Sequence, residues 1–167
     1  MTNDQTGNQR ASEGALEAEA VAAVERFCRE LIANLHLKLD LSVRDEGRIV
    51  HVNLSGPDRP VLLAGTAAVL NSVEYLMNKA FRTGKDEEIA TIIFDSDSYR
   101  QQREAELRLL AQIASQKVIA QRRPLSLQPM NPRERRIVHL ALAEVQGVRS
   151  QSDGDGDQRN ITIYPTD

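Results

Sequence analysis

The sequence predicts an α+β fold built from two small units. Its 167 residues suffice for one domain or for two small ones with modest cores. In some segments apolar residues recur at the three- and four-residue steps of a helix, and in others they alternate with polar residues as in a strand. In chain order these segments read α-β-β-α-β and then α-β-α-β-β, which indicates two units that share or meet at a helix near residues 100–122.

The first half begins with a polar segment, residues 1–16, in which no apolar periodicity is visible. We expect this segment to be disordered, because it offers too little apolar surface to pack. After it the sequence predicts, in order, a helix at 21–35, strands at 37–43 and 50–54 joined by a turn at 45–47, a short apolar run at 61–64, a helix at 70–81 with Gly84 as its stop, and a strand at 89–94.

The second half opens on a long helical stripe that ends at Pro124, because a proline disfavours helical geometry in the residue before it. Asn131 is a good N-cap and Pro132 suits a first helical turn, so we expect another helix from there to about Val145. The remaining predicted elements are a short strand at 125–127 and a final hairpin with strands near Val148 and at 160–164, separated by the acidic turn 153–157.

The composition excludes several classes of protein. A net charge of -3 argues against a chain that coats nucleic acid over its whole surface, so any contact with a polyanion is local. A lone Cys28 cannot form an internal disulfide, and no export signal is visible. The longest apolar runs fall far short of the roughly 20 residues of a membrane-crossing helix. We therefore expect a cytoplasmic protein that does not insert into a membrane.

Positive charge is concentrated between residues 116 and 139. This stretch holds six cationic side chains and Glu134 as its one acidic residue, although the whole chain is acidic. Such asymmetry is typical of a surface that binds a phosphate backbone, and the plainer alternative is a solvated face with acidic neighbours elsewhere. The six residues are Lys117, Arg122, Arg123, Arg133, Arg135 and Arg136.

Helical geometry places three of the candidate binding residues together. At about 100° per residue, Arg135, Arg136 and His139 fall in one sector of the helix predicted from Pro132. A guanidinium binds phosphate with two parallel hydrogen bonds or stacks on a base, and an imidazole donates to an oxygen or stacks on a ring. The alternative is structural: His139 caps a neighbouring carbonyl, and Arg135 pairs with an acidic side chain such as Glu134 or Asp153.

The sequence offers little support for catalysis. The three histidines, His36, His51 and His139, lie on different predicted elements, without cysteine or acidic residues at metal-ligand spacing. No P-loop and no Gly-x-Ser-x-Gly elbow is present. We therefore expect a protein that is not an enzyme, with no catalytic residues, no metal site and no cofactor.

Residues 128–142 resemble a known signature. From Met130 to His139 they read Met-Asn-Pro-Arg-Glu-Arg-Arg-Ile-Val-His, which is similar to the RxxxH domain, a single-stranded nucleic-acid-binding module named for an Arg and a His separated by three residues. This form of the signature is the one seen in the bacterial Jag family, also called SpoIIIJ-associated or KhpB proteins, in which a KH domain precedes the RxxxH domain. The resemblance extends from about residue 17 to Pro165.

The resemblance implies a type II KH-like α/β sandwich for residues 17–97 and a small α+β RxxxH domain, a three-stranded sheet with helices, for residues 98–167. KH domains clamp phosphates with a Gly-x-x-Gly loop. The corresponding positions lack both glycines and the basic residue between them, and a Cβ obstructs the approach of phosphate to the backbone. We therefore expect a degenerate KH unit whose loop is Ala64, Gly65, Thr66 and Ala67.

The function implied by the resemblance is non-catalytic binding of RNA or another single-stranded nucleic acid, mainly through the second unit. The alternative is a protein-docking adaptor with little affinity for nucleic acid. That alternative follows because Jag relatives are linked to the membrane-protein insertase, to a small KH partner protein and to control of the cell envelope and cell division. Both functions are compatible with a homodimer. The residues expected to bind nucleic acid are Arg135, His139, Arg136, Arg133, Arg122 and Arg123.

Overall fold

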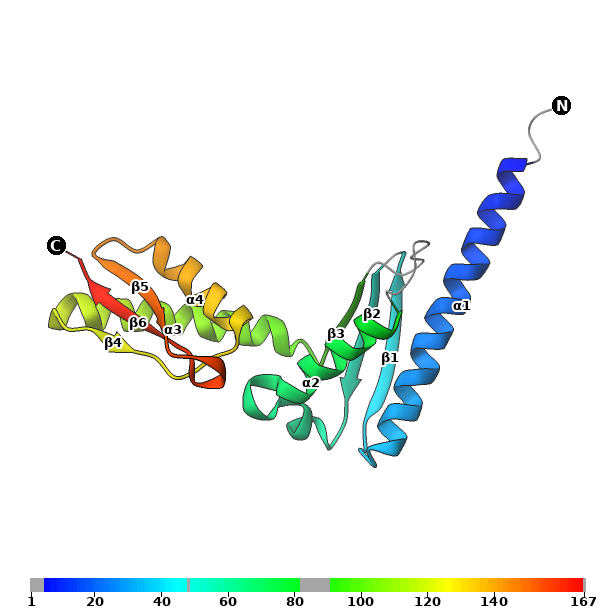
Figure 1. The fold of residues 1–167 in the computed structure, drawn as a ribbon, viewed down its shortest axis with the longest axis horizontal. Coiled ribbons are helices and arrows are strands. Elements are labelled where there is room, and N and C mark those ends of the chain that lie inside the picture. The colour runs from blue at the N-terminus through cyan, green and yellow to red at the C-terminus, as the bar shows by residue number, and fades with distance from the viewer. Residues whose placement is uncertain (1–4, 48, 82–90, 167) are drawn as a thin grey trace. The chain divides into compact units, whose positions relative to one another are not determined.

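The computed structural model describes residues 5–47, 49–81 and 91–166. It divides into two compact units, Met1–Asp97 and Ser98–Asp167. Within the described residues the chain forms four α-helices and two three-stranded sheets, one sheet in each unit (Figure 1). The predicted α+β composition is therefore confirmed, whereas the assignment of the first unit as KH-like stays a prediction.

The first unit packs helices against a sheet of order β1-β2-β3. Strands β1 and β2 are antiparallel, and β3 lies parallel to β2. The residues at the centre of its core are fully buried and come from both helices and from two of the strands. Its elements are α1 (Gln5–Asn34), β1 (Asp40–Glu46), β2 (Ile49–Ser55), α2 (Arg59–Phe81) and β3 (Thr91–Asp95).

The beginning of α1 differs from the sequence prediction. Residues 1–4 of the predicted disordered segment lie outside the described residues, but the backbone is helical from Gln5 onward. The segment lacks an apolar stripe, and it holds two glycines, Gly7 and Gly14, but only two alanines and one glutamate. Alanine and glutamate, which have high intrinsic helix propensity, become frequent only from Ala15 onward, so the local sequence gives no reason for the helix to begin at Gln5.

The only cysteine, Cys28, is buried on the core-facing side of α1. Burial, assisted by the nearby carboxylate of Glu25, raises the pKa of its thiol to about 11. Because the thiolate is the reactive form, Cys28 acts as a small apolar core residue.

Strand β1 begins three residues later than the alternation of leucines predicts. Its first residue, Asp40, pairs with Ser55, the last residue of β2, so the residues before Asp40 have no strand opposite them. At Gly56 the chain turns with φ of +120°, and a Cβ there would lie 2.8 Å from the carbonyl oxygen of Lys38. This close approach of the two backbones ends the hairpin and needs a glycine.

Helix α2 consists of two helical pieces joined at residues 64–67. Ala64 is extended, and Gly65, Thr66 and Ala67 all have the left-handed backbone, with φ near +60°. For the two non-glycine residues this conformation costs about 1–2 kcal/mol each. The segment predicted as the degenerate KH loop is therefore a tight left-handed turn between two helices. Gly84, the predicted helix stop, lies outside the described residues.

By length and composition alone, α2 could cross a membrane. Its backbone leaves helical geometry in the middle, however, and Leu62, Leu70, Val73 and Met77 are buried against the sheet of the first unit. These core contacts account for the apolar residues on the face of α2 that packs against the sheet.

The outer edge of β3 is covered by side chains of α2. Asn78 donates from Nδ2 to the Ile92 carbonyl (2.6 Å) and accepts from the Ile92 amide at Oδ1 (3.0 Å). The Phe94 amide donates to Glu74 Oε2 (2.8 Å). These contacts satisfy backbone groups that an unprotected edge strand would offer to another strand.

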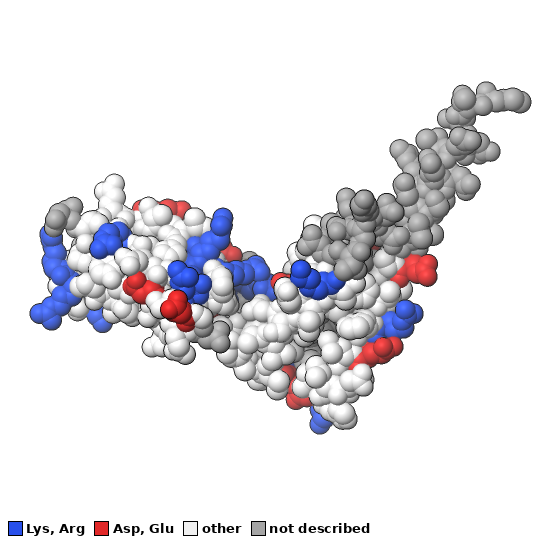
Figure 2. Space-filling model, in the orientation of Figure 1, with Lys and Arg blue, Asp and Glu red and all other residues white. Residues whose placement is uncertain are grey.

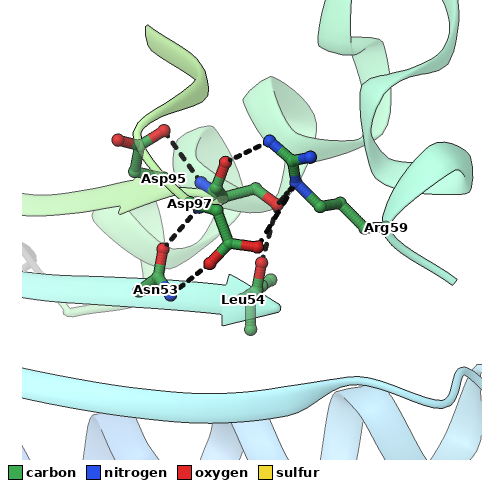
Figure 3. A network of polar contacts seen from close by, with 6 residues as sticks. Asn53, Leu54, Arg59, Asp95 and Asp97 are labelled. Atoms are coloured by element: carbon green, nitrogen blue, oxygen red, sulfur yellow. Dashed lines mark hydrogen bonds and ion pairs between the residues drawn. The ribbon is translucent and has the colours of Figure 1, made fainter. Parts of the chain in front are cut away.

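A polar network joins the ends of β2 and β3 to the start of α2 (Figure 3). Ser96 is fully buried and donates to the Leu54 carbonyl at 2.7 Å. Arg59 donates from Nε to Ser96 Oγ (3.0 Å) and from Nη2 to the Ser96 carbonyl (2.9 Å), and it forms an ion pair with Asp97. Asn53 and Asp97 are also hydrogen-bonded to each other. The network fixes the last residues of the first unit.

The second unit packs two helices on a sheet of order β4-β6-β5, in which both pairings are antiparallel. Its core combines one face of each helix with the buried isoleucines of the central strand, Ile161 and Ile163. Apart from a short 3-10 turn, Gly156–Gln158, its elements are α3 (Tyr99–Gln121), β4 (Leu125–Ser126), α4 (Pro132–Ala143), β5 (Val148–Asp153) and β6 (Asn160–Pro165).

Candidate nucleic-acid interface

The start of α4 is fixed by a capping box. The Asn131 side chain accepts a hydrogen bond from the Glu134 amide (2.9 Å), and the Glu134 carboxylate accepts one from the Asn131 amide (3.2 Å). Glu134 is only 4% exposed, and its second oxygen accepts from Arg103 Nε of α3 at 2.7 Å. A cap and a salt bridge to the neighbouring helix thus hold the first turn of α4 rigidly.

Arg135 and His139 lie one turn apart on the flank of α4 that faces β5, and both are half-buried. Arg135 Nη1 donates to the Met130 carbonyl at 2.6 Å. His139 Nδ1 is 2.7 Å from Ser150 Oγ of β5. Each side chain is therefore held on one side by the protein, and its remaining nitrogen atoms are the ones left to bind a ligand.

The sequence left open a structural role for these two residues, in which His139 caps a carbonyl and Arg135 pairs with an acidic side chain. The observed contacts differ from it in part. Among the described residues, the hydrogen-bond partner of His139 is a serine hydroxyl and not a carbonyl. Arg135 does bond a carbonyl, that of Met130, but Glu134 pairs with Arg103 instead. In the described ranges no ion pair joins Arg135 or His139 to a carboxylate. The positive charge of Arg135 is thus not neutralised locally.

The environment of His139 predicts a pH dependence of stability. Burial lowers the pKa of the imidazole below its ordinary value of 6.5, and the charge of Arg135 lowers it further. The unfolded chain therefore binds this proton more readily than the folded one. The stability associated with neutral His139 is intact above pH 6.5 and is lost as the pH falls below 6.5 toward the lower pKa of the folded state.

We expect urea unfolding to show this loss between pH 7.5 and pH 5.5. The matched control is His139→Gln, which keeps a polar side chain but cannot titrate, so its stability should fall less over the same range. Equal losses in the two proteins would contradict the assigned pKa direction.

The structure divides the predicted basic residues into two groups. Arg133 and Arg136 are exposed in the first two turns of α4; Arg136 lies in the same sector as Arg135, and Arg133 points about 160° away from it. Arg122 and Arg123 follow the far end of α3. Arg103, which contacts the start of α4, precedes Arg122 by 19 residues, so Arg122 lies about 28 Å farther along the helix axis. On the face that Figure 2 shows, the basic residues of the second unit likewise form separate groups.

Residues of β5, and the residue that precedes β6, also lie beside α4, although the sequence did not single them out. Ser150 contacts His139, and Arg159 Nε donates to Ser152 Oγ at 2.9 Å. Strand periodicity could have identified Arg159 in the sequence. It lies two residues before the core residue Ile161 and so shares that residue's face of the sheet. Nothing in the sequence pairs a particular serine with His139.

Comparison with known proteins relates this region to a family. The family model of the RxxxH (R-three-H) domain matches residues 105–165. The chain is 32% identical over 139 residues to the RNA-binding protein KhpB of Clostridium symbiosum, which covers 82% of this chain and 62% of that protein.

Two further relatives carry the same name. The RNA-binding protein KhpB of Lactiplantibacillus plantarum is 26% identical over 162 residues, which covers 95% of this chain and 50% of that protein. The RNA-binding protein KhpB of Bacillus subtilis is 25% identical over 128 residues, which covers 75% of this chain and 61% of that protein. The chain thus matches between 50% and 62% of the length of these curated relatives.

Proposed function

Because the chain belongs to the Jag, or KhpB, family and contains an RxxxH domain, we propose that it is a non-catalytic protein that binds RNA or another single-stranded nucleic acid. The binding surface is the first two turns of α4, which carry Arg133, Arg135, Arg136 and His139. The observation that carries this proposal is the pair Arg135 and His139, anchored side by side with no carboxylate partner among the described residues.

The chemistry of this pair suits an unpaired strand. The guanidinium of Arg135 binds phosphate or stacks on a base, and the imidazole of His139 donates to an oxygen or stacks on a ring. The chain has no tryptophan and only six other aromatic residues, so stacking platforms for several bases are scarce. We therefore expect weak to moderate binding that depends little on base sequence.

The left-handed turn at residues 64–67 supports a lesser role for the first unit. It lacks a basic side chain and carries a Cβ at three of its four positions. Alanine methyl groups hinder the close approach of phosphate to the backbone that glycines permit. The first unit then acts as a scaffold, and the nucleic acid is bound by the second unit.

The test is fluorescence anisotropy of a labelled 12-nucleotide single-stranded RNA at two salt concentrations. The double variant Arg135→Ala plus His139→Ala should weaken binding by at least about 10-fold, since it removes a charge-assisted contact and a ring contact. For the wild type, three to four neutralised phosphates give a slope of log affinity against log salt of about -2 to -3.

The matched control is Lys79→Ala. At neutral pH it removes one positive charge, as the double variant does, but from an exposed position on α2 in the first unit. We expect its affinity to change by less than about 2-fold. Equal affinities for the wild type and the double variant would contradict the proposed function.

Protein docking is the second candidate function, and exposed apolar surface favours it. Tyr75 and Leu76 are 63% and 61% exposed on α2, and Leu109 and Ile113 are 56% and 57% exposed on α3. Such surface is typical of contacts with other proteins. Binding of a small KH partner protein that survives in the Arg135→Ala plus His139→Ala variant but is lost in Leu109→Glu plus Ile113→Glu would support it.

A further inference from the structure

Two serines of β5 each contact a nitrogen-bearing side chain from another element. Ser150 Oγ is 2.7 Å from His139 Nδ1, and Ser152 Oγ accepts from Arg159 Nε at 2.9 Å. Ser150 and Ser152 are two residues apart on one strand, so their side chains lie on the same face, about 7 Å from each other. His139 and Arg159 are therefore held next to each other along β5.

The loop residue Met130 links Arg159 to Arg135. The Met130 carbonyl accepts from Arg135 Nη1 at 2.6 Å, and the Met130 amide donates to the Arg159 carbonyl at 3.1 Å. Through Ser150 and Ser152, which share one face of β5, His139 of α4 and Arg159, the residue before β6, lie on the same side of the sheet. Arg135 lies one turn from His139 on α4. We name this surface the β5 strip and define it as Arg135, His139, Ser150, Ser152 and Arg159.

We propose that Arg159 is a further phosphate-binding residue for the single-stranded nucleic acid, and that Ser150 and Ser152 are positioning residues for His139 and Arg159. This inference rests on the proposed function and extends its surface across β5. Among the side chains that the structure describes, a set that does not include Asp157, no carboxylate forms an ion pair with Arg159. Its side chain is exposed, so a phosphate can reach it.

The hydrogen bonds to the serines determine which atoms face the ligand. Ser152 occupies Nε of Arg159, which leaves both Nη groups to bind a phosphate with two parallel hydrogen bonds. Ser150 occupies Nδ1 of His139. When the serine hydroxyl donates to Nδ1, the ring proton resides on Nε2, and Nε2 becomes a donor to a phosphate oxygen. Each serine thus orients the donor atoms of a residue that binds the ligand.

Arg149 provides a matched control for Arg159. It is an exposed arginine of the same hairpin, but it alternates with the two serines on β5 and therefore lies on the opposite face of the sheet. On that face the guanidinium of Arg149 lies over the ring of Tyr164, with its Cζ atom 4.3 Å from the ring centroid. Arg149→Ala and Arg159→Ala remove the same charge from opposite faces of one sheet.

The experiment measures the affinity of the full chain for a labelled 12-nucleotide oligouridine. We expect Arg159→Ala to weaken binding about 5-fold and to make the salt slope less steep by about 0.7, the contribution of one phosphate. Arg149→Ala should change the affinity by less than about 2-fold. Equal effects of the two substitutions would overturn the role of Arg159.

The positioning role of Ser150 has a spectroscopic test. The nitrogen chemical shifts of His139 should show the proton on Nε2 in the wild type at pH 8 and a mixture of the two tautomers in Ser150→Ala. Ser150→Thr, which restores a hydroxyl, should restore both the tautomer and the affinity. An unchanged tautomer in Ser150→Ala would overturn the positioning role, and unchanged far-UV circular dichroism verifies that the variant is folded.

The outcomes distinguish this inference from the proposed function. If Arg135→Ala plus His139→Ala abolishes binding while Arg159→Ala and Arg149→Ala behave alike, the surface ends at α4 and only the inference fails. If the double variant also binds normally, the proposed function itself fails. Two results together support both the proposed function and the role of Arg159: the double variant loses binding, and Arg159→Ala weakens binding more than Arg149→Ala does.

Discussion

Replacing Glu134 with alanine is expected to lower the free energy of unfolding of the second unit by about 3 kcal/mol. The substitution removes the carboxylate that accepts from both Arg103 and the Asn131 amide. Arg103 is about one-third exposed and also contacts Glu106, so water and that carboxylate compensate part of its lost partner. The loss therefore stays below that expected for a fully buried charge pair.

Native-state hydrogen exchange of the slowest amides in α3 and α4 measures this loss within the second unit alone. Glu134→Gln keeps an acceptor for the Asn131 amide but loses the charge. Its free energy of unfolding should therefore lie between those of the wild type and Glu134→Ala. The neighbouring exposed residue gives the control, since Arg133→Ala should change the stability by less than about 0.5 kcal/mol. Similar protection in Glu134→Ala and Arg133→Ala would refute the structural role of Glu134.

Replacing Asn78 with alanine is expected to destabilise the first unit by about 2 kcal/mol, because two hydrogen bonds to the Ile92 backbone are lost in a partly buried site. The same substitution uncovers part of the β3 edge. Unpaired edge groups are a template for another strand. We therefore expect the variant to self-associate at high concentration more than the wild type.

Thermal unfolding followed by circular dichroism gives the stability, and sedimentation velocity gives the association state. Lys79→Ala is the control, because it alters the adjacent, exposed position on the same helix. Its stability should remain within about 0.5 kcal/mol of the wild type. If Asn78→Ala unfolds at the temperature of this control, the contacts of Asn78 with Ile92 do not stabilise the edge.

Local sequence signals predicted the elements whose ends are determined locally. Asn131 and Pro132 predicted the start of α4, and the structure has a complete capping box there. Strand β1 was misplaced, because its first paired residue, Asp40, depends on where the partner strand ends. The helical start at Gln5 was missed because the prediction relied on an apolar stripe, which that segment lacks.

The candidate surface was predictable only where one helix supplies it. Arg135 and His139 share a face because of helical geometry, and that spacing is visible in the sequence. Arg122 was grouped with them because it is near in sequence, yet the length of α3 separates it from the start of α4. Ser150 and Arg159 join the surface through tertiary contacts, which the sequence does not encode at any fixed spacing.

The left-handed turn at residues 64–67 has an evolutionary consequence. Ala67 already holds the backbone conformation that glycine adopts without strain. An Ala67→Gly substitution would therefore follow the existing path of the chain, at the cost of one buried methyl group. An evolving chain can therefore exchange the side chains of this turn for glycine by point substitution, without a new path for its backbone.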